Sequence, residues 1–494
     1  MAEQSHFVLI PFLAQGHMIP MMDIARLLAS RGVVITVITT PLNAKRLEPV
    51  MSRMDANGLK IRMIRVHFPA VEVGLPEGCE NFDMLPSLED GLKFLQAAQM
   101  MQPSIEKVLE ELEPSPICLI SDMCFPFTTE VASKFEIPRI VFHGMCCFAL
   151  VCFHIFGLLE NFDNIPSSDT EYFVLPGLPD KIELTKLQIV GSVTASQHRE
   201  HWIQFRSKMK EAEAVAFGVV SNSFEALEPE YIKEYRKVQG KKVWCIGPVS
   251  LSNKDSQDKA IRGNKAAIDE KNVIEWLDSL KPMSALYVCP GSLSKLGTSQ
   301  LIELGLGLES SNMPFIWVLR EPPEKFKNWL EEEKFEERVK GRGLLIKGWA
   351  PQVLILSHDS VGGFLTHCGW NSSLEGISAG LPLITWPYFA DQFCNERLIV
   401  NVLGVGVQAG VEVPVLIGQE ENMGVLVTRD DIKMVVEKLM DGGVEGEVRR
   451  NRAKELGEMA RRAVDEGGSS HLSITQLIQD IIAEAVKKSC DTKE

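Results

Sequence analysis

One 44-residue stretch, from Trp349 to Gln392, gathers the residue types that could bind a nucleotide and a sugar. In its middle, an apolar strand leads through a turn that carries His367 into Asn371 and Ser372, which open a helix. Because free backbone N–H groups and the helix dipole converge at a helix N-terminus, this arrangement makes an anion site. Aromatic rings, a carboxylate one helical turn further on and a closing acid–amide pair surround it: Trp349, Trp370, Glu375, Asp391 and Gln392. The set suits a base, a ribose, a diphosphate and a sugar bound in sequence.

A second candidate group lies far upstream. His17 follows the first predicted strand, and Pro20 is well placed to begin the helix after it. Asp122 ends another apolar strand, 117–122. A carboxylate that holds one imidazole nitrogen fixes the tautomer and raises the basicity of the other nitrogen, which is the chemistry of a general base. A histidine that only fills its loop is the competing interpretation, and the sequence alone does not show that the two side chains meet.

The stretch Trp349–Gln392 closely resembles, from end to end, the donor-binding box of plant uridine-diphosphate-dependent glycosyltransferases of family 1. The similarity continues from Phe7 to the last helix. The resemblance implies that Trp349 stacks on uracil and that Ala350 offers backbone groups to the edge of the base. It also implies that Gln352 and Glu375 hydrogen-bond the ribose, and that His17 is the general base with Asp122 as its partner.

The diphosphate leaving group needs its charge neutralised. The chain has no Asp-x-Asp pair, the usual means of holding a divalent metal on a nucleotide sugar, so we expect a metal-independent route that uses hydrogen bonds and a helix dipole. The candidates are His367, Asn371 and Ser372 in the box, and Ser292 in the turn after the strand 285–289. No permanently bound cofactor is expected.

For the sugar, the resemblance implies Trp370, Asp391 and Gln392. In the family, a glutamine at the last position of the box goes with glucose and a histidine with galactose, so Gln392 favours UDP-glucose as co-substrate. Two positions depart from the family pattern. Pro290 stands where relatives usually carry Leu or Phe, and Met145 stands where many have a Thr that can touch the sugar.

Length and composition limit the class of protein. A chain of 494 residues is too long for one core and predicts two domains. The formal net charge of −15 argues against nucleic acid and anionic membranes as partners. Eleven cysteines without a CxxC pair fit a reduced, cytoplasmic compartment. The N-terminus does not resemble a signal peptide and no stretch is long and apolar enough for a membrane span, so we expect a cytoplasmic protein and a monomer.

Short apolar strands alternate with amphipathic helices in both halves, which predicts parallel α/β sheets. We expect two Rossmann-like domains that face each other across a cleft, the GT-B type. The predicted boundaries are an acceptor-binding domain at 1–249, an exposed linker at 250–271, and a UDP-sugar-binding domain at 272–470. The final helix, 471–494, is expected to pack back on the first domain.

These features favour an inverting transfer of glucose from UDP-glucose to a hydroxyl group, giving a β-O-glucoside. The acceptor is expected to be a lipophilic plant metabolite, a triterpenoid or steroid before a flavonoid or other phenolic, because the loops expected to hold it are apolar. A nucleotide-dependent oxidoreductase is the main alternative, but the first strand is followed by Ala14–His17 and not by GxGxxG. A non-catalytic nucleotide-sugar binder is disfavoured by the presence of both His17 and Asp122.

Overall fold

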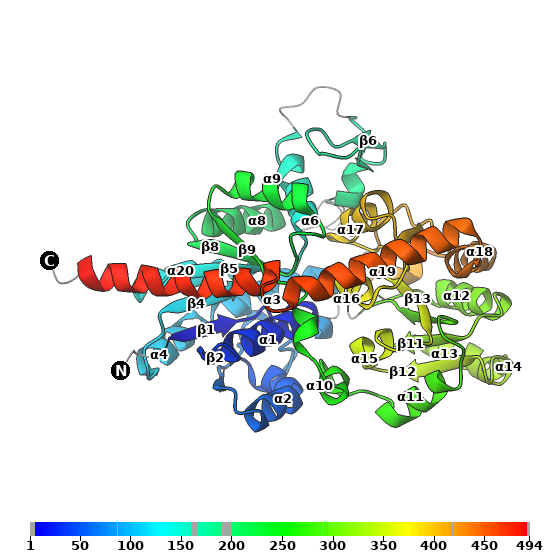
Figure 1. Ribbon diagram of the computed structural model, residues 1–494, viewed down its shortest axis with the longest axis horizontal. Coiled ribbons are helices and arrows are strands. Elements are labelled where there is room, and N and C mark those ends of the chain that lie inside the picture. Colours follow the sequence, from blue (N-terminus) through cyan, green and yellow to red (C-terminus); the bar gives the residue numbers. More distant parts are fainter. Residues whose placement is uncertain are drawn as a thin grey trace. The chain divides into compact units, whose positions relative to one another are not determined.

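The computed structural model describes residues 5–85, 87–159, 166–189, 199–291, 293, 295–415 and 418–491 (Figure 1). The chain divides into two compact units. The first unit comprises Met1–Cys146, Ser196–Lys254 and Arg462–Glu494, and the second comprises Cys147–Ala195 and Asp255–Arg461. This division departs from the predicted domain boundaries chiefly at residues 147–195, which group with the second unit because α6 (Cys147–Phe156) packs against α17 (Gln392–Arg397).

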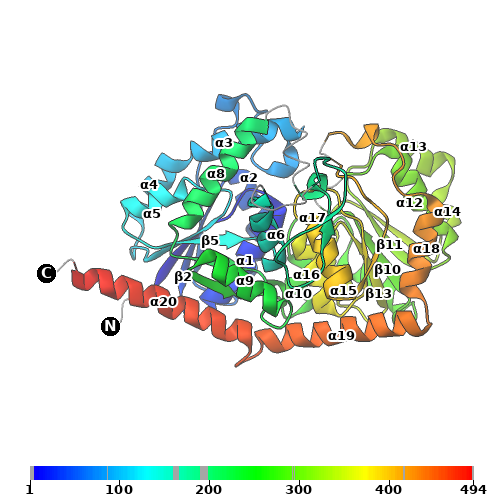
Figure 2. The ribbon, with the colours of Figure 1, turned by 90° about the horizontal axis from the view of Figure 1, so that it is seen from above.

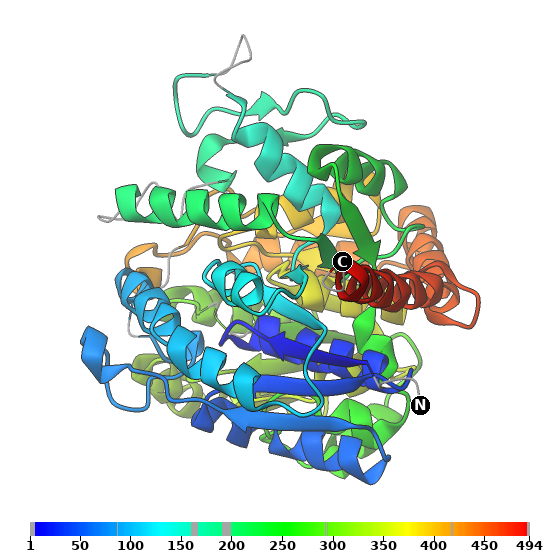
Figure 3. The same cartoon turned by 90° about the vertical axis from the view of Figure 1, so that its left-hand side faces the viewer.

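The first unit is built on a seven-stranded sheet in which all neighbouring strands pair in parallel. In spatial order its strands are β3 (Ile61–Arg65), β2 (Val34–Thr39), β1 (His6–Ile10), β4 (Cys118–Asp122), β5 (Arg139–His143), β8 (Gly218–Ser221) and β9 (Lys242–Cys245). Its longer helices are α1 (Gln15–Ala29), α2 (Pro41–Ala56), α3 (Gly91–Gln99), α4 (Gln102–Glu111), α5 (Thr128–Lys134), α8 (Arg199–Ala214), α9 (Pro229–Gln239) and α20 (Ser469–Asp491). Short 3-10 turns are η1 (Val71–Val73), η2 (Phe82–Met84), η3 (Leu88–Asp90) and η5 (Val249–Ser252). In Figure 3 the blue N-terminal strands lie side by side in this sheet.

The second unit contains a six-stranded sheet whose neighbours also pair in parallel. In spatial order its strands are β12 (Gly343–Lys347), β11 (Phe315–Leu319), β10 (Ala285–Cys289), β13 (Val361–Thr366), β14 (Leu383–Thr385) and β15 (Gly406–Gln408). A separate antiparallel pair is formed by β6 (Phe173–Val174) and β7 (Glu183–Leu184). Figure 2 shows β10, β11 and β13 adjoining one another in the larger sheet.

The helices of the second unit connect these strands and follow the last of them. They are α6, α10 (Ser256–Ile261), α11 (Glu270–Asp278), α12 (Thr298–Ser310), α13 (Glu324–Glu332), α14 (Phe335–Arg338), α15 (Gln352–Leu356), α16 (Trp370–Ala379), α17, η6 (Leu398–Val402), η7 (Glu420–Asn422) and α18 (Arg429–Met440). The long helix α19 (Val444–Val464) begins in the second unit and ends in the segment Arg462–Glu494, which belongs to the first unit.

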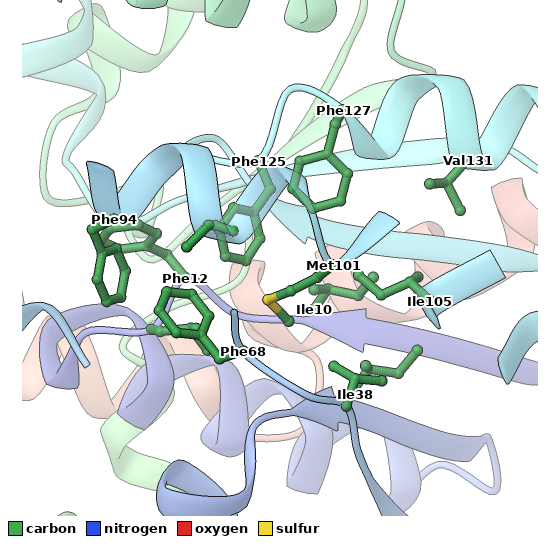
Figure 4. Close-up of a cluster of buried hydrophobic side chains, with 14 of the residues drawn as sticks. Ile10, Phe12, Ile38, Phe68, Phe94, Met101, Ile105, Phe125, Phe127 and Val131 are labelled. Atoms are coloured by element: carbon green, nitrogen blue, oxygen red, sulfur yellow. The ribbon is translucent and has the colours of Figure 1, made fainter. Parts of the chain in front are cut away.

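The central strands are mostly apolar and are buried along their whole length, as a parallel sheet covered on both faces requires. In the first unit, a cluster of buried hydrophobic side chains packs between the sheet and the helices α3, α4 and α5 (Figure 4). Phe12, Phe94 and Phe125 lie at its centre, with ring centroids of Phe12–Phe94 and Phe12–Phe125 5.9 and 5.6 Å apart.

The first helix begins earlier than the sequence suggested. Strand β1 ends at Ile10, and α1 already starts at Gln15, with the N–H groups of His17 and Met18 bonded to Ala14 O at 3.0 and 2.9 Å. Pro20 therefore lies inside α1, and the prediction that it begins the helix is wrong. A proline at this position forfeits one backbone N–H donor of the helix.

The interval 250–271 is not the exposed, structureless linker that its polar composition predicted. It contains η5 and α10, and the side chains of Ser250, Asn253 and Asp258 are buried. Asn253 Nδ2 donates to Asp23 Oδ1 at 2.8 Å, and Asp255 caps α10 by accepting from the N–H of Asp258. Polar residues here satisfy one another inside the protein, which composition alone does not reveal.

The last helix, α20, packs along the edge strand β9 of the first unit. Asp480 accepts hydrogen bonds from Lys242 Nζ at 2.6 Å and Trp244 Nε1 at 3.1 Å, and Ser470 Oγ donates to Gly247 O at 2.5 Å. The helix thereby covers the open edge of the sheet.

Candidate active site and donor-binding residues

His17 and Asp122 meet in the first unit. His17 lies in the first turn of α1, and its Nδ1 is 2.7 Å from Oδ2 of Asp122, the last residue of β4. The Asp122 side chain is fully buried, whereas that of His17 is 29% exposed. The carboxylate accepts the Nδ1 proton, so Nε2 is the nitrogen with a lone pair and the imidazole keeps access to solvent.

Sheet topology brings these two residues together across 105 positions of sequence. Strands β1 and β4 are neighbours in parallel register, with Ile10 opposite Ser121. Because parallel strands all end at one edge of the sheet, the residues that follow β1 and those that end β4 lie side by side.

A buried arginine supports the acid. Asp122 Oδ1 accepts the N–H of Cys124 at 2.9 Å, while Arg139 on the neighbouring strand β5 donates to Ser121 Oγ at 2.9 Å and to Asp122 O at 3.5 Å. Burial lowers the pKa of Arg139 to about 10, so its guanidinium stays protonated at neutral pH. The Asp122 carboxylate is therefore held by a backbone N–H group, while Arg139 holds the main chain at the end of β4.

Aromatic rings fix the imidazole on its other side. The ring of Phe12 meets that of His17 edge-on, with centroids 5.2 Å apart and planes at 72°. Phe12 is itself packed among Phe82, Phe94 and Phe125. His17 therefore lies at the border of this cluster of buried hydrophobic side chains.

In the second unit, Trp349 lies just after β12 with its ring next to an arginine. The Arg320 guanidinium carbon is 5.1 Å from the Trp349 ring centroid, and Trp349 O accepts the N–H of Ala267 at 2.8 Å. Trp349 is half-buried and the neighbouring Ala350 is buried. The arginine and the backbone hydrogen bond hold the indole in place just after the end of β12.

Gln352 and Glu375, the two residues predicted to bind the ribose, are in direct contact. Gln352 Nε2 donates to Glu375 Oε2 at 2.7 Å and to Ser372 Oγ at 3.0 Å. The second carboxylate oxygen, Glu375 Oε1, is 2.5 Å from Nη1 of Arg262, a residue from the segment after α10. The three box residues come from α15 and α16, which pack against each other.

His367 stands in the turn between β13 and α16, wedged between two glycines. A Cβ at Gly291 would lie 2.5 Å from His367 Cε1, and one at Gly369 would overlap the same ring. Burial lowers the pKa of His367 to about 4, so the imidazole is neutral at physiological pH. Its Nδ1 is enclosed and has no hydrogen-bond partner within the described residues.

Helix α16 begins beside this histidine at Trp370, which is buried. Gly369 at its N-cap supplies no side-chain cap, and Asn371 and Ser372 occupy the first turn. The Oγ atom of Ser373 is buried and, among the described residues, lacks a partner. Ser292, the remaining phosphate candidate, lies outside the described residues, although Pro290 before it directly follows the end of β10.

Asp391 and Gln392 differ in how much of each side chain is already engaged. Gln392 Oε1 accepts the backbone N–H groups of Tyr388 and Phe389 at 2.8 and 3.1 Å, so its amide presents an N–H donor, not an acceptor. Asp391 Oδ2 accepts from Asn395 Nδ2 at 2.8 Å. Met145, the other departure from the family pattern, lies in the first unit, and its carbonyl accepts from Ser221 Oγ at 3.2 Å.

Three arginines that contact the candidate site residues were not identified from the sequence: Arg139, Arg262 and Arg320. Arg139 had a usable signal, because a charged residue at the start of a buried strand needs a partner. Arg320 follows the strand β11 directly and had a weaker one. Arg262 had no such signal, since it lies in a polar interval where a positively charged residue is ordinary.

Two parallel α/β units, one with a histidine–aspartate pair and one with nucleotide-binding residue types at the carboxyl ends of its strands, define a glycosyltransferase of the GT-B fold. A family model described as UDP-glucoronosyl and UDP-glucosyl transferase matches residues 265–417, and one described as Glycosyltransferase, N-terminal domain, matches residues 3–251. The chain belongs to the plant UDP-dependent glycosyltransferases of family 1.

Individual relatives agree. UDP-glycosyltransferase 73C25 of Barbarea vulgaris is 54% identical over 484 residues, covering 97% of this chain and 96% of that protein. The crystal structure of Glycyrrhiza uralensis UGT73P12 complexed with glycyrrhetinic acid 3-O-monoglucuronide superposes with a TM-score of 0.90 at 36% identity, covering 99% and 98% of the two chains. Medicago truncatula UGT71G1 complexed with UDP-glucose gives 0.76 at 25% identity, covering 97% and 98%.

The protein is therefore an enzyme that uses a UDP-sugar as co-substrate, and the oxidoreductase and non-catalytic alternatives are rejected. Over the described part of the chain, no helix is long and apolar enough to cross a membrane. No group of three or more His, Cys, Asp or Glu residues within that same part is placed to hold a metal ion.

Proposed function

We propose that this enzyme transfers glucose from UDP-glucose to a hydroxyl group of a lipophilic plant secondary metabolite, with inversion and without a metal ion, to give a β-O-glucoside. The observation that carries the proposal is the 2.7 Å contact between His17 Nδ1 and a fully buried Asp122 carboxylate. This contact leaves His17 Nε2 as a base next to a partly exposed surface.

In the proposed reaction, the acceptor oxygen attacks the anomeric carbon of glucose from the face opposite the diphosphate. As the new C–O bond forms, His17 Nε2 takes the hydroxyl proton and the bond between the anomeric carbon and the phosphate oxygen breaks. Asp122 stabilises the imidazolium that results, and UDP departs with the electron pair. Attack opposite the leaving group accounts for inversion.

The charge of the departing diphosphate would be met by hydrogen-bond donors. The first N–H groups of α16 have no intrahelical acceptor and concentrate positive potential at Trp370, Asn371 and Ser372. A neutral His367 donates one N–H without repelling other donors. Ser292 remains part of this proposal by resemblance alone.

The nucleoside and sugar would be bound by the remaining box residues. Trp349 stacks on uracil, Ala350 offers its backbone to the base, and the contacting pair Gln352 and Glu375 binds the ribose. Trp370, Asp391 and Gln392 bind glucose, with Asp391 accepting from a sugar hydroxyl and Gln392 donating to one.

A triterpenoid or steroid acceptor is favoured over a flavonoid or other phenolic. UGT73P12, a structural relative at 36% identity, was crystallised with glycyrrhetinic acid 3-O-monoglucuronide, a conjugate of a triterpenoid acid. The first-half loops expected to hold the acceptor are rich in Leu, Phe, Met and Ile, which suits a bulky lipophilic molecule. A cavity of about 490 Å³ in the second unit is less suitable, because Lys181, Glu183, Glu396 and Arg397 line it.

The test is a transfer assay with UDP-glucose and a panel of triterpenoid, steroid and flavonoid acceptors, in EDTA without added metal. We expect release of UDP, a mass gain of one hexosyl unit and a β-configured product by NMR. An α-configured product would exclude inversion, and activity restored only by a divalent cation would exclude the metal-independent route. Faster turnover with UDP-galactose would overturn the choice of glucose. Cell fractionation and size-exclusion chromatography test the cytoplasmic location and the monomer that we also propose.

A further inference from the structure

Arg262 is a buried cation in a segment whose composition indicated solvent exposure. Its side chain is 8% exposed, and its Nη1 lies 2.5 Å from Oε1 of Glu375, whose side chain is 5% exposed. Both residues belong to the second unit. Removing an ion pair from water costs several kcal/mol per ion, so a pair this enclosed is weak evidence for stability and calls for another role.

The pair is part of a three-residue arrangement in which each carboxylate oxygen has its own donor. Arg262 holds Glu375 Oε1, and Gln352 Nε2 holds Oε2 at 2.7 Å. Two donors on different oxygens fix the plane of the carboxylate as well as its position. A carboxylate has about four lone-pair sites, so Glu375 can still accept from a ligand hydroxyl.

The same segment also contacts the other residue predicted for the nucleoside. The N–H of Ala267, five residues after Arg262, donates to Trp349 O at 2.8 Å. Helix α10, which ends at Ile261 just before Arg262, packs against α15, the helix that begins with Gln352. The segment 262–267 therefore joins the proposed base-stacking residue to the proposed ribose-binding carboxylate.

We propose that Arg262 is a positioning residue that orients Glu375 toward the vicinal hydroxyls of the donor's ribose, and that it thereby makes the enzyme select ribonucleotides over 2′-deoxyribonucleotides. The inference rests on the proposed function, in which Glu375 binds the ribose of UDP-glucose. Arg262 acts through Glu375. Without Arg262, the Glu375 carboxylate would rotate. It would then accept a hydrogen bond from one ribose hydroxyl less well than from the other.

The experiment compares the affinities of UDP and 2′-deoxy-UDP by isothermal titration calorimetry. Wild type is expected to prefer UDP by about tenfold or more, the typical value of a hydrogen bond to a charged group. Arg262→Met is expected to weaken UDP by about tenfold and 2′-deoxy-UDP by much less, so that the preference falls toward one. Arg262→Lys, which keeps the charge but not the planar guanidinium, is expected to retain part of the preference for UDP over 2′-deoxy-UDP.

Two further variants separate positioning from folding. Lys265→Met removes an exposed cation three residues away in the same segment and should leave both affinities unchanged. The double variant Arg262→Met/Glu375→Gln removes the unpaired buried charge, so it should fold as judged by circular dichroism and still lack the preference for UDP.

The outcomes are distinct. Equal weakening of UDP and 2′-deoxy-UDP in Arg262→Met would show a merely structural role and overturn the inference, as would a wild type that binds both equally. An unchanged preference in a folded Arg262→Met variant would also overturn it. A wild-type protein that transfers no glucose from UDP-glucose and binds no UDP would instead overturn the proposed function.

Discussion

His17 and His367 are two imidazoles that the chain holds in opposite electrostatic settings. His17 has a buried carboxylate on Nδ1 and keeps part of its ring exposed, which favours acceptance of a proton. His367 is half-buried beside two glycines without a carboxylate partner among the described residues, and burial lowers its pKa to about 4. The first setting suits a base and the second a neutral hydrogen-bond donor.

Replacing His17 tests the base at this scale. We expect His17→Ala to lower kcat by about 10³-fold and Asp122→Asn by about 10²-fold, while UDP affinity stays within about twofold, because general-base catalysis contributes about 10²–10⁴. The loss should shrink with a more acidic phenolic acceptor, whose proton leaves more easily. His67→Ala, at an exposed histidine 3.4 Å from Glu72, is the control. Wild-type turnover by His17→Ala would contradict the assignment.

The pKa of His367 predicts acid sensitivity of the fold. Burial lowers this pKa from 6.5 to about 4, so between these values the unfolded chain binds a proton that the folded protein does not. The contribution to stability is therefore present above pH 6.5 and is lost as the pH falls to about 4. As the pH falls from 6.5 to about 4, the free energy of unfolding should decrease by about 1–2 kcal/mol more in wild type than in His367→Gln. This figure allows for the partial exposure of the imidazole. Parallel urea titrations of both proteins at pH 4–7 check this, and identical pH slopes would refute it.

At the scale of elements, the donor residues depend on two neighbouring strands. Cys289 at the end of β10 lies opposite Thr366 at the end of β13, so the turns that follow these strands adjoin. Gly291 has a φ of 96° and leaves the space that the His367 ring fills. This close approach requires a residue without a side chain.

Adding one methyl group to this turn should disturb the donor site. Gly291→Ala places a Cβ against the His367 ring in addition to straining a positive φ, so we expect UDP affinity to fall by about tenfold or more. Gly341→Ala, with a φ of 86° and no atom within 4 Å of its added Cβ, carries only the backbone strain. It should lose stability but keep UDP affinity, as measured by calorimetry. Equal losses of affinity in both variants would refute a specific role for the turn.

At the scale of the whole molecule, each unit is assembled from separated parts of the chain. The second unit needs residues 147–195 as well as 255–461. Arg397 Nε donates to Glu183 O at 2.9 Å, and Gln188 Nε2 donates to Glu412 O at 2.8 Å. Helix α6 and strand β7, which belong to the segment 147–195, therefore cover a face of α17 that would otherwise be exposed.

A fragment that contains only the continuous segment 255–461 should be less stable than the complete second unit. A fragment of residues 255–461 leaves the partners of Glu183 and Gln188 unpaired, and we expect it to unfold at least about 5 °C below a fusion that joins 147–189 to 255–461 through a Gly/Ser linker. Differential scanning calorimetry with and without UDP measures this. If the shorter fragment melts at the same temperature and binds UDP equally well, residues 147–195 are not an integral part of the unit.

Much of this protein follows from local patterns. Strand β10 begins and ends where the apolar run 285–289 predicted, and Asp122 ends β4 as expected, because a buried parallel strand needs a largely apolar run. The resemblance of the box Trp349–Gln392 to the donor-binding box of plant glycosyltransferases implied a UDP-sugar enzyme, and family membership confirms that class. Helix starts were less certain, since Pro20 signals a first turn but is tolerated within α1.

Contacts between distant residues were decided only by the tertiary structure. The meeting of His17 and Asp122 depends on β1 and β4 being neighbours, and strand order is not written in any single strand. The burial of Arg262 against Glu375 depends on where the segment after α10 lies, although its composition resembles that of a solvated loop. Local sequence determines which residues are apolar and which carry chemistry, whereas a carboxylate acquires its partner only when the packing of strands and helices places a donor within hydrogen-bonding distance.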